Sequence, residues 1–203
     1  MKWLFKSPSY EEIIHLLAAW RIWLVGAVAG GLIACLVYVI APPPYRSQAT
    51  VLIDHNIEQV IPVEDDDTKR FYYLQEENDK LVEIAWSDQV LEKITVETGI
   101  SVSVLKADYL QLGHPGDGGW HLMAESRDAQ EAQEIASAWG QAFVEILQQG
   151  GPGVNPLMEF KLVQAGNDDL ARSLPIGTFL FLGSIMGVAI MAFLVLFIHQ
   201  KEG

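Results

Sequence analysis

Two long runs of uncharged, mostly apolar residues lie near the two ends of the chain. The run from Ile22 to Ile40 has nineteen residues without a charge, and the run from Leu174 to Ile198 has twenty-five. Both are long enough to cross a hydrocarbon core roughly 30 Å thick, so the pattern predicts transmembrane helices at 22–41 and 174–198. A secretory signal peptide is the alternative for the first run, but IAPPPY at its end has no clear small-residue cleavage site.

The segment before the first run carries the signals of a helix start. Ser9 precedes Glu12 by three residues, and an apolar stripe follows, which is the pattern of a capping box. Residues 1–21 are therefore expected to form a segment with an amphipathic helix along the membrane surface. A plain extension of the transmembrane helix fits the same residues.

Three consecutive prolines, residues 42–44, end the first apolar run. They lack backbone donors and force extended geometry on the residue before each, so no helix continues past Ala41. Apolar residues then alternate with others over residues 48–53, which predicts a strand of about ten residues.

The next part of the chain reads as a loop followed by two helices. Residues 56–70 are acidic and show no periodicity, and they lack the ligand spacing of a calcium loop. Residues 71–99 have helical periodicity with a break near Trp86. Ser87 is the expected cap of the second piece and Gly99 its stop.

A hairpin, a third helix and a last strand complete the central region. The predicted hairpin pairs 101–112 with 120–124 across the turn-rich GHPGDGG. Asp128, three residues before Glu131, caps the clearest helical stripe of the chain. Alternation in PLMEFKLVQAG predicts the last strand.

The element order β-α-β-β-α-β predicts an α+β domain over residues 42–173 with the ferredoxin-like split βαβ arrangement. In that arrangement the first and last strands lie side by side and antiparallel. The membrane gives an independent reason, because one strand would leave the bilayer and the other would return to it.

Charge changes the picture in two ways. The central region holds nine Lys or Arg against twenty-three Asp or Glu, a net charge of −14, which is a poor match for nucleic acid. The short flanks carry mostly positive charge and are therefore expected in the cytoplasm, with 199–203 as a cytoplasmic tail and 42–173 outside. The flanking charges are Lys2, Lys6, Arg21 and Lys201 against Glu11, Glu12 and Glu202.

Candidate chemistry is sparse along the chain. The five histidines have no metal-ligand spacing, and neither a G-x-S-x-G elbow nor a P-loop is present. Carboxylate pairs such as Glu125 and Asp128 arise by chance in so acidic a region. Cys35 is the only cysteine and lies in the first apolar run, so no disulfide forms within the chain. The expectation is a protein that is not an enzyme and uses no cofactor or metal.

Each apolar run contains a small-residue motif. Gly26 and Gly30 form one GxxxG, and Gly183 and Gly187 form another. Glycines at this spacing let helix backbones approach closely, which predicts a packing face either within one chain or between protomers.

The chain resembles the Wzz-type chain-length determinants, also called polysaccharide co-polymerases. The resemblance lies in PPPYRSQATVLID after the first run, WSDQVLEKITVETGI, the helix DAQEAQEIASAWGQAFVEI and a last run entered through a proline. The residues that match the family motif are Pro44, Tyr45, Ser47, Ala49 and Pro175.

This resemblance implies a non-enzymatic protein of the bacterial inner or plasma membrane that forms homo-oligomers and sets the length of a surface polysaccharide by acting on its polymerase. Short relatives act as adaptors of a cytoplasmic tyrosine kinase. The chain departs from larger members because only GGPGVNP lies where they have a long helical arm, and from the adaptors because only HQKEG follows Ile198. The alternative is a structural accessory subunit of another membrane complex.

Overall fold

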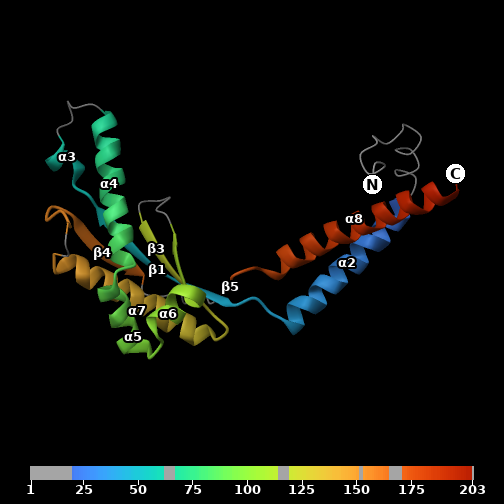
Figure 1. Cartoon of the computed structure of the whole chain (residues 1–203), viewed down its shortest axis with the longest axis horizontal. Coiled ribbons are helices and arrows are strands. Elements are labelled where there is room, and N and C mark those ends of the chain that lie inside the picture. Colours follow the sequence, from blue (N-terminus) through green and yellow to red (C-terminus); the bar gives the residue numbers. More distant parts are fainter. Residues whose placement is uncertain (1–19, 62–66, 114–118, 151–152, 165–170, 203) are drawn as a thin grey trace. The chain divides into compact units, whose positions relative to one another are not determined.

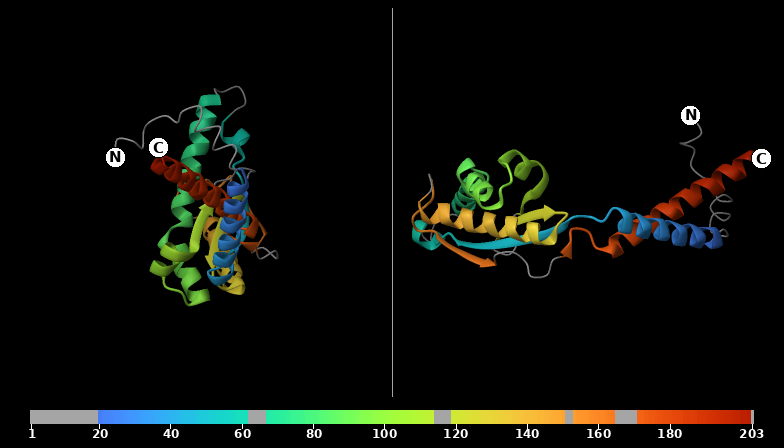
Figure 2. Two further views of the ribbon diagram at one scale, coloured as in Figure 1. Left: turned by 90° about the vertical axis from the view of Figure 1, so that its right-hand side faces the viewer. Right: turned by 90° about the horizontal axis from the view of Figure 1, so that it is seen from below.

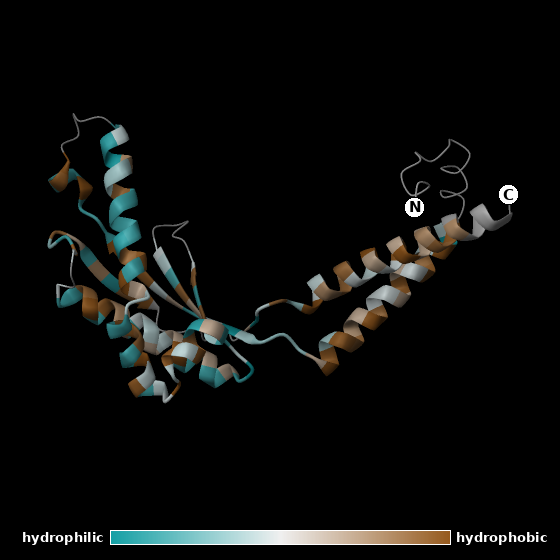
Figure 3. Cartoon of the chain, viewed as in Figure 1, coloured by the Kyte–Doolittle hydropathy of each residue, from teal (hydrophilic) through white to brown (hydrophobic). Residues whose placement is uncertain are grey.

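The computed structural model describes residues 20–61, 67–113, 119–150, 153–164 and 171–202, and the chain divides into two compact units. Residues 1–43 and 174–203 form the first unit, and residues 44–173 form the second (Figure 1). The division follows the hydropathy pattern, since apolar residues dominate the first unit and polar residues are frequent in the second (Figure 3).

The first unit is a pair of antiparallel helices, α2 (Trp20–Ile40) and α8 (Ile176–Glu202). Both are long and apolar enough to span a membrane, and few of their side chains are buried within the protein. The two predicted apolar helices are thus confirmed. Their bounds differ slightly, and α8 continues as helix through most of the predicted tail at 199–203. The predicted capping box and surface helix at 1–19 lie outside the described residues.

The second unit is built on an antiparallel sheet. Its strands are β1 (Tyr45–Asp54), β2 (Leu110–Gly113), β3 (Gly119–Ser126), β4 (Glu159–Gln164) and the short β5 (Ala171–Arg172). The strand order is β2-β3-β1-β4, and β5 also pairs with β1. The first long strand therefore lies beside the returning strands, as the sequence predicts, with Val51 opposite Leu162 and Tyr45 opposite Arg172.

Three long helices lie on one side of this sheet: α4 (Asp67–Ala85), α5 (Asp88–Thr98) and α7 (Ala129–Gln148) (Figure 2). The core lies between helices and sheet, because alternate residues of β1 point toward α7 and are buried. Trp139 on α7 is fully buried and donates its indole N–H to the carbonyl oxygen of Ala85 at 3.0 Å. This bond ties α4 to α7.

The helix ends confirm the predicted caps. The hydroxyl of Ser87 accepts a hydrogen bond from the Val90 N–H at 3.4 Å, and Gly99 ends α5 with a φ of 75°. The carboxylate of Asp128 accepts from the backbone N–H groups of Gln130 and Glu131 at 2.8 and 3.2 Å. The caps were readable because each depends on residue type within one turn.

Two predicted segments are wrong in part. The strand predicted at 101–112 is α6 (Val102–Val104) and a π-helical turn η1 (Leu105–Tyr109) before β2 begins at Leu110. Leu105 is fully buried in the core, so tertiary packing overrides the β-branched character of this segment.

The loop predicted at 56–70 is also partly helical. A short helix, α3, occupies Ile57–Val60 after Asn56, which has a left-handed φ of 44°. The long helix α4 already begins at Asp67, within the acidic run. An aspartate in a first helical turn is stabilised by the helix dipole, so the acidic residue there favours helix rather than loop.

Candidate functional site

The four glycines of the two GxxxG motifs face one another between α2 and α8 of a single chain. A Cβ atom added at Gly26 would lie 2.8 Å from the carbonyl oxygen of Gly187 and 2.6 Å from the Cγ of Met191. A Cβ added at Gly30 would meet the carbonyl oxygen of Gly183 at still shorter range. We call these four glycines the glycine seam. Only a residue without a side chain permits this approach of the two backbones.

The seam continues toward the end of α2 with larger contacts. Ala34 packs against Gly183. One turn further, the rings of Tyr38 and Phe179 meet edge to face with centroids 5.2 Å apart. The opposite end of α2 carries Trp20, whose ring lies 5.7 Å from the guanidinium of Arg21. Aromatic residues at both ends of an apolar helix are typical of the two membrane interfaces.

Away from the seam, α2 and α8 expose large apolar side chains. Leu32 and Phe181 are each 66 % exposed. Contact between these side chains and lipid tails would cost no free energy, whereas their contact with water is unfavourable. Each helix therefore has one face that packs against the other helix, and its remaining apolar surface is compatible with a membrane.

The second unit begins and ends at one place, which we call the base of the domain and define by Pro44, Tyr45, Arg127, Arg172 and Ser173. The N–H of Ser173 donates to the carbonyl oxygen of Pro44 at 2.9 Å. The guanidinium of Arg172 lies 4.4 Å from the centroid of the Tyr45 ring and donates to its hydroxyl at 3.2 Å. Pairing at the base thus combines backbone and side-chain contacts.

The family-motif residues have distinct positions. Pro44 and Tyr45 belong to the base, while Ser47 and Ala49 are fully buried on the helix-facing side of β1. The carbonyl oxygen of Pro175 accepts a hydrogen bond from Thr178 at the start of α8. The structure brings Pro44 and Tyr45 together with Arg172, a residue that the sequence analysis did not select.

A second position missed from the sequence is Gly140 in the middle of α7. A Cβ added there would lie 2.7 Å from the Cβ of Ala49 and 3.1 Å from the Cδ1 of Leu162. The glycine lets α7 approach the two central strands closely. A glycine inside an amphipathic helix is the signal that would have identified it.

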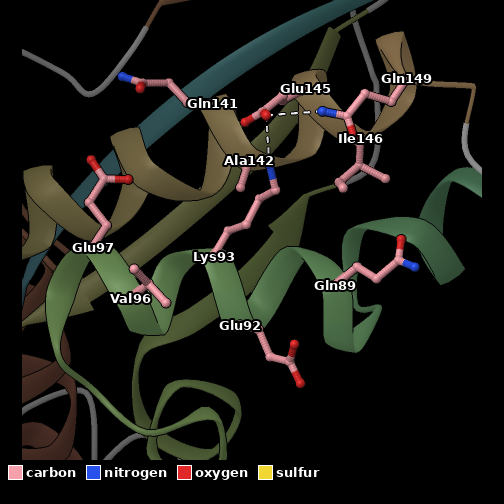
Figure 4. A pocket seen from close by; sticks show the side chains of 10 residues that line it. All are labelled: Gln89, Glu92, Lys93, Val96, Glu97, Gln141, Ala142, Glu145, Ile146 and Gln149. Carbon is pink, nitrogen blue, oxygen red and sulfur yellow. Dashed lines mark hydrogen bonds and ion pairs between the residues drawn. The ribbon is translucent and has the colours of Figure 1, made fainter.

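A hollow that is open to solvent lies between α5 and α7 (Figure 4). Its volume is about 670 Å³. The Lys93 ammonium donates to the Glu145 carboxylate at 2.7 Å, and this bond lowers the pKa of Glu145. Val96 at the edge of the hollow is 87 % exposed. The lining residues are Gln89, Glu92, Lys93, Val96, Glu97, Gln141, Ala142, Glu145, Ile146 and Gln149.

Titratable side chains outside this hollow include a half-buried histidine, His55. Burial lowers the pKa of His55, against the opposing charges of Glu77 and Asp54. The Nε2 of His55 is buried, and no described residue gives it a hydrogen bond. Glu77, only 5 % exposed, accepts from Lys80 at 2.9 Å. Within the described ranges, no three His, Cys, Asp or Glu residues are grouped to hold a metal ion.

The expectation that the protein is not an enzyme stays a prediction. No protein-family model matches the chain, and no curated protein matches it either.

Proposed function

We propose that this chain is a two-pass protein of the bacterial inner membrane, with both termini in the cytoplasm and a ferredoxin-like domain outside. The strand order β2-β3-β1-β4, with every neighbouring pair antiparallel, supports the ferredoxin-like assignment. The two apolar helices support the two passes. The basic residues of the short flanks support the orientation.

We further propose that the protein is a non-enzymatic polysaccharide co-polymerase or adaptor that works through homo-oligomeric assembly. The observation that carries this proposal is the joining of the domain's two ends at the base, where Ser173 bonds to Pro44. Each end continues into an apolar helix within four residues. Two short, adjacent connections restrain the domain more than one flexible tether would.

Such a connection suits a protein in which the assembly of the outer domains acts on a polymerase within the membrane. The resemblance of residues 42–54 and of α7 to the chain-length determinants is the reason for naming a glycan in this proposal. The central region has a net charge of −14, which disfavours direct binding of an acidic glycan. The polymerase or a tyrosine kinase is therefore the proposed partner.

The test is a gene deletion followed by gel electrophoresis of the surface polysaccharide. We expect the deletion to change the distribution of chain lengths, and the wild-type gene to restore it. A variant with Gly187→Leu should restore it poorly, and a variant with Gly177→Leu should restore it fully, because only Gly187 lies in the seam. An unchanged ladder in the deletion strain would refute the length-control role.

A structural accessory subunit is the second candidate. It is favoured by the short connection between α7 and β4, which leaves ten residues from Gln149 to Met158 and no projecting arm. Co-purification in mild detergent separates the two functions. A glycan polymerase or kinase supports the first, and an unrelated complex in fixed stoichiometry supports the second.

A further inference from the structure

The hollow between α5 and α7 has one wall on each of these two helices (Figure 4). On α5 its lining residues extend from Gln89 to Glu97, and on the other side they extend from Gln141 on α7 to Gln149, just after it. At a rise of 1.5 Å per residue, each wall is about 12 Å long. We call this hollow the α5–α7 groove. A groove of this length accommodates about two turns of a third helix.

Apolar side chains form the inner part of the groove. Ala142 and Ile146 of α7 line it and are only 5 % and 7 % exposed. Val96 of α5 lies at its edge and is 87 % exposed, the largest fraction among the exposed large apolar residues that the structure describes. Contact between Val96 and water is unfavourable, and a third helix over the groove would remove it. The inner groove therefore fits aliphatic side chains.

The charge of the groove is negative. Three carboxylates and one ammonium group line it, which gives a net charge of −2. The Lys93 ammonium donates to the Glu145 carboxylate, and the Gln149 amide donates to the same carboxylate at 3.0 Å. Glu92 and Glu97 are both exposed, and within the described ranges neither takes part in a salt bridge. These two carboxylates on the α5 wall are therefore available to the cations of a partner.

The charge of the whole domain decides between two kinds of partner. Residues 42–173 have a net charge of −14, so a second copy of this chain would bring like charges together at an acidic groove. Juxtaposed like charges suppress association, whereas opposite charges favour it and fix its register. A segment that carries Lys or Arg would pair with Glu92 and Glu97 and would reduce the negative charge. The groove is therefore complementary to a basic partner and not to another acidic domain.

We propose that the α5–α7 groove binds a short, basic amphipathic helix of a different protein. Two aliphatic side chains of that helix, three or four positions apart, contact Val96 and Ile146. Lys or Arg residues beside them pair with Glu92 and Glu97. The bound segment lies on the same side of the membrane as the domain. The proposal rests on the groove alone and not on any role in polysaccharide synthesis.

The test is site-specific photo-crosslinking of the full chain in the cells that naturally produce it. The photoreactive residue p-benzoylphenylalanine replaces Val96, a change that leaves the fold intact because the side chain is almost fully exposed. Mass spectrometry then locates the crosslinked position in the captured protein. We expect that position to lie in a segment with net positive charge and with aliphatic residues three or four positions apart.

A charge variant tests the ion pairs of the groove. With the photoreactive residue at position 96, E92Q/E97Q should lower the yield of the adduct about fourfold, since one exposed ion pair changes an equilibrium about twofold. The matched control is E58Q/D79N, which removes the same charge from exposed positions of α3 and α4 and should leave the yield unchanged. An equal loss in both variants would overturn the proposal, because it would show a general charge effect.

The identity of the adduct decides the occupant. Crosslinking of position 96 to a second copy of this chain, to lipid alone, or to a neutral or acidic segment would overturn the proposal, and so would the absence of an adduct from protein present at its normal level. A probe at Tyr72, which is 65 % exposed on α4, is the positional control. Capture of the same segment there with equal yield would also overturn it. Because this readout is separate from the polysaccharide ladder, either proposal can fail alone.

Discussion

The N–H of Ser173 donates a hydrogen bond to the carbonyl oxygen of Pro44, although 129 positions separate the two residues in sequence. The bond closes the domain where the chain enters it and leaves it. Tyr45 and Arg172, the sequence neighbours of Pro44 and Ser173, also pair with each other. Beyond these pairs the chain continues into α2 on one strand and into α8 on the other. The chain thus enters and leaves the domain at one edge of the sheet, and each connecting segment leads to an apolar helix.

The glycine seam should be intolerant of larger side chains. Changing Gly187 to Leu inserts a side chain where the carbonyl oxygen of Gly26 lies, and should destabilise the helix pair by about 1–3 kcal/mol. Thermal unfolding of the full chain in detergent measures the effect. Gly177→Leu on the same helix is the control, since a Cβ there meets nothing within 4 Å. Equal melting temperatures for the two variants would contradict the seam.

Replacing Gly140 by alanine should destabilise the protein, although the same change inside a helix usually stabilises it. In a helix interior this change normally adds about 1 kcal/mol of stability. Here the new Cβ would lie 2.7 Å from the Cβ of Ala49, so we expect Gly140→Ala to lower the free energy of unfolding by about 1 kcal/mol or more. Chemical denaturation of the full chain in detergent measures it. The double variant A49G/G140A should recover part of the loss, and strict additivity would contradict the contact.

The two well-defined helix caps should differ in strength. Asp128 accepts two backbone hydrogen bonds, at 2.8 and 3.2 Å, whereas Ser87 accepts one at 3.4 Å. We expect Asp128→Ala to destabilise the protein by about 1 kcal/mol and Ser87→Ala by less. Denaturation curves recorded side by side give the order. A larger loss for Ser87→Ala would contradict the cap geometry.

Stability should fall when His55 is protonated. Burial lowers the pKa of His55 in the folded protein below its ordinary value of 6.5, so protons bind the unfolded chain more readily. The stabilisation is present above pH 6.5 and is lost as pH falls through the folded-state pKa. Denaturant midpoints at pH 7.5 and 5.5 should therefore differ more in the wild type than in His55→Gln. The same difference in both proteins would exclude His55 as its source.

Local signals predicted much of the fold. The prolines after Ala41 predicted the end of α2. Helix ends were also predicted correctly at Ser87, Gly99 and Asp128. The alternation around Ala49 predicted β1. These features depend on neighbours within one or two turns. The segment at 102–109 was missed because its conformation depends on Leu105 reaching a core built from distant elements.

The candidate site also has features that local sequence signals predict and features that depend on the whole fold. The four seam glycines could be selected from their spacing, because small residues four positions apart form one stripe on a helix. Arg172 and Gly140 could not be paired with Tyr45 and Ala49, because strand register and helix docking bring them together across 127 and 91 positions. Spacing identifies a face, and only the fold identifies what lies opposite it.

The central claim is that α2 and α8 cross a membrane and leave the domain on the side opposite the two termini. Single cysteines at Gln89 and at Lys201, each in a Cys35→Ser background, test it by labelling with a membrane-impermeant maleimide in spheroplasts. The account predicts that the cysteine at 89 is labelled directly and the cysteine at 201 only after permeabilisation. Labelling of both positions without permeabilisation, in spheroplasts shown to be intact, would contradict it.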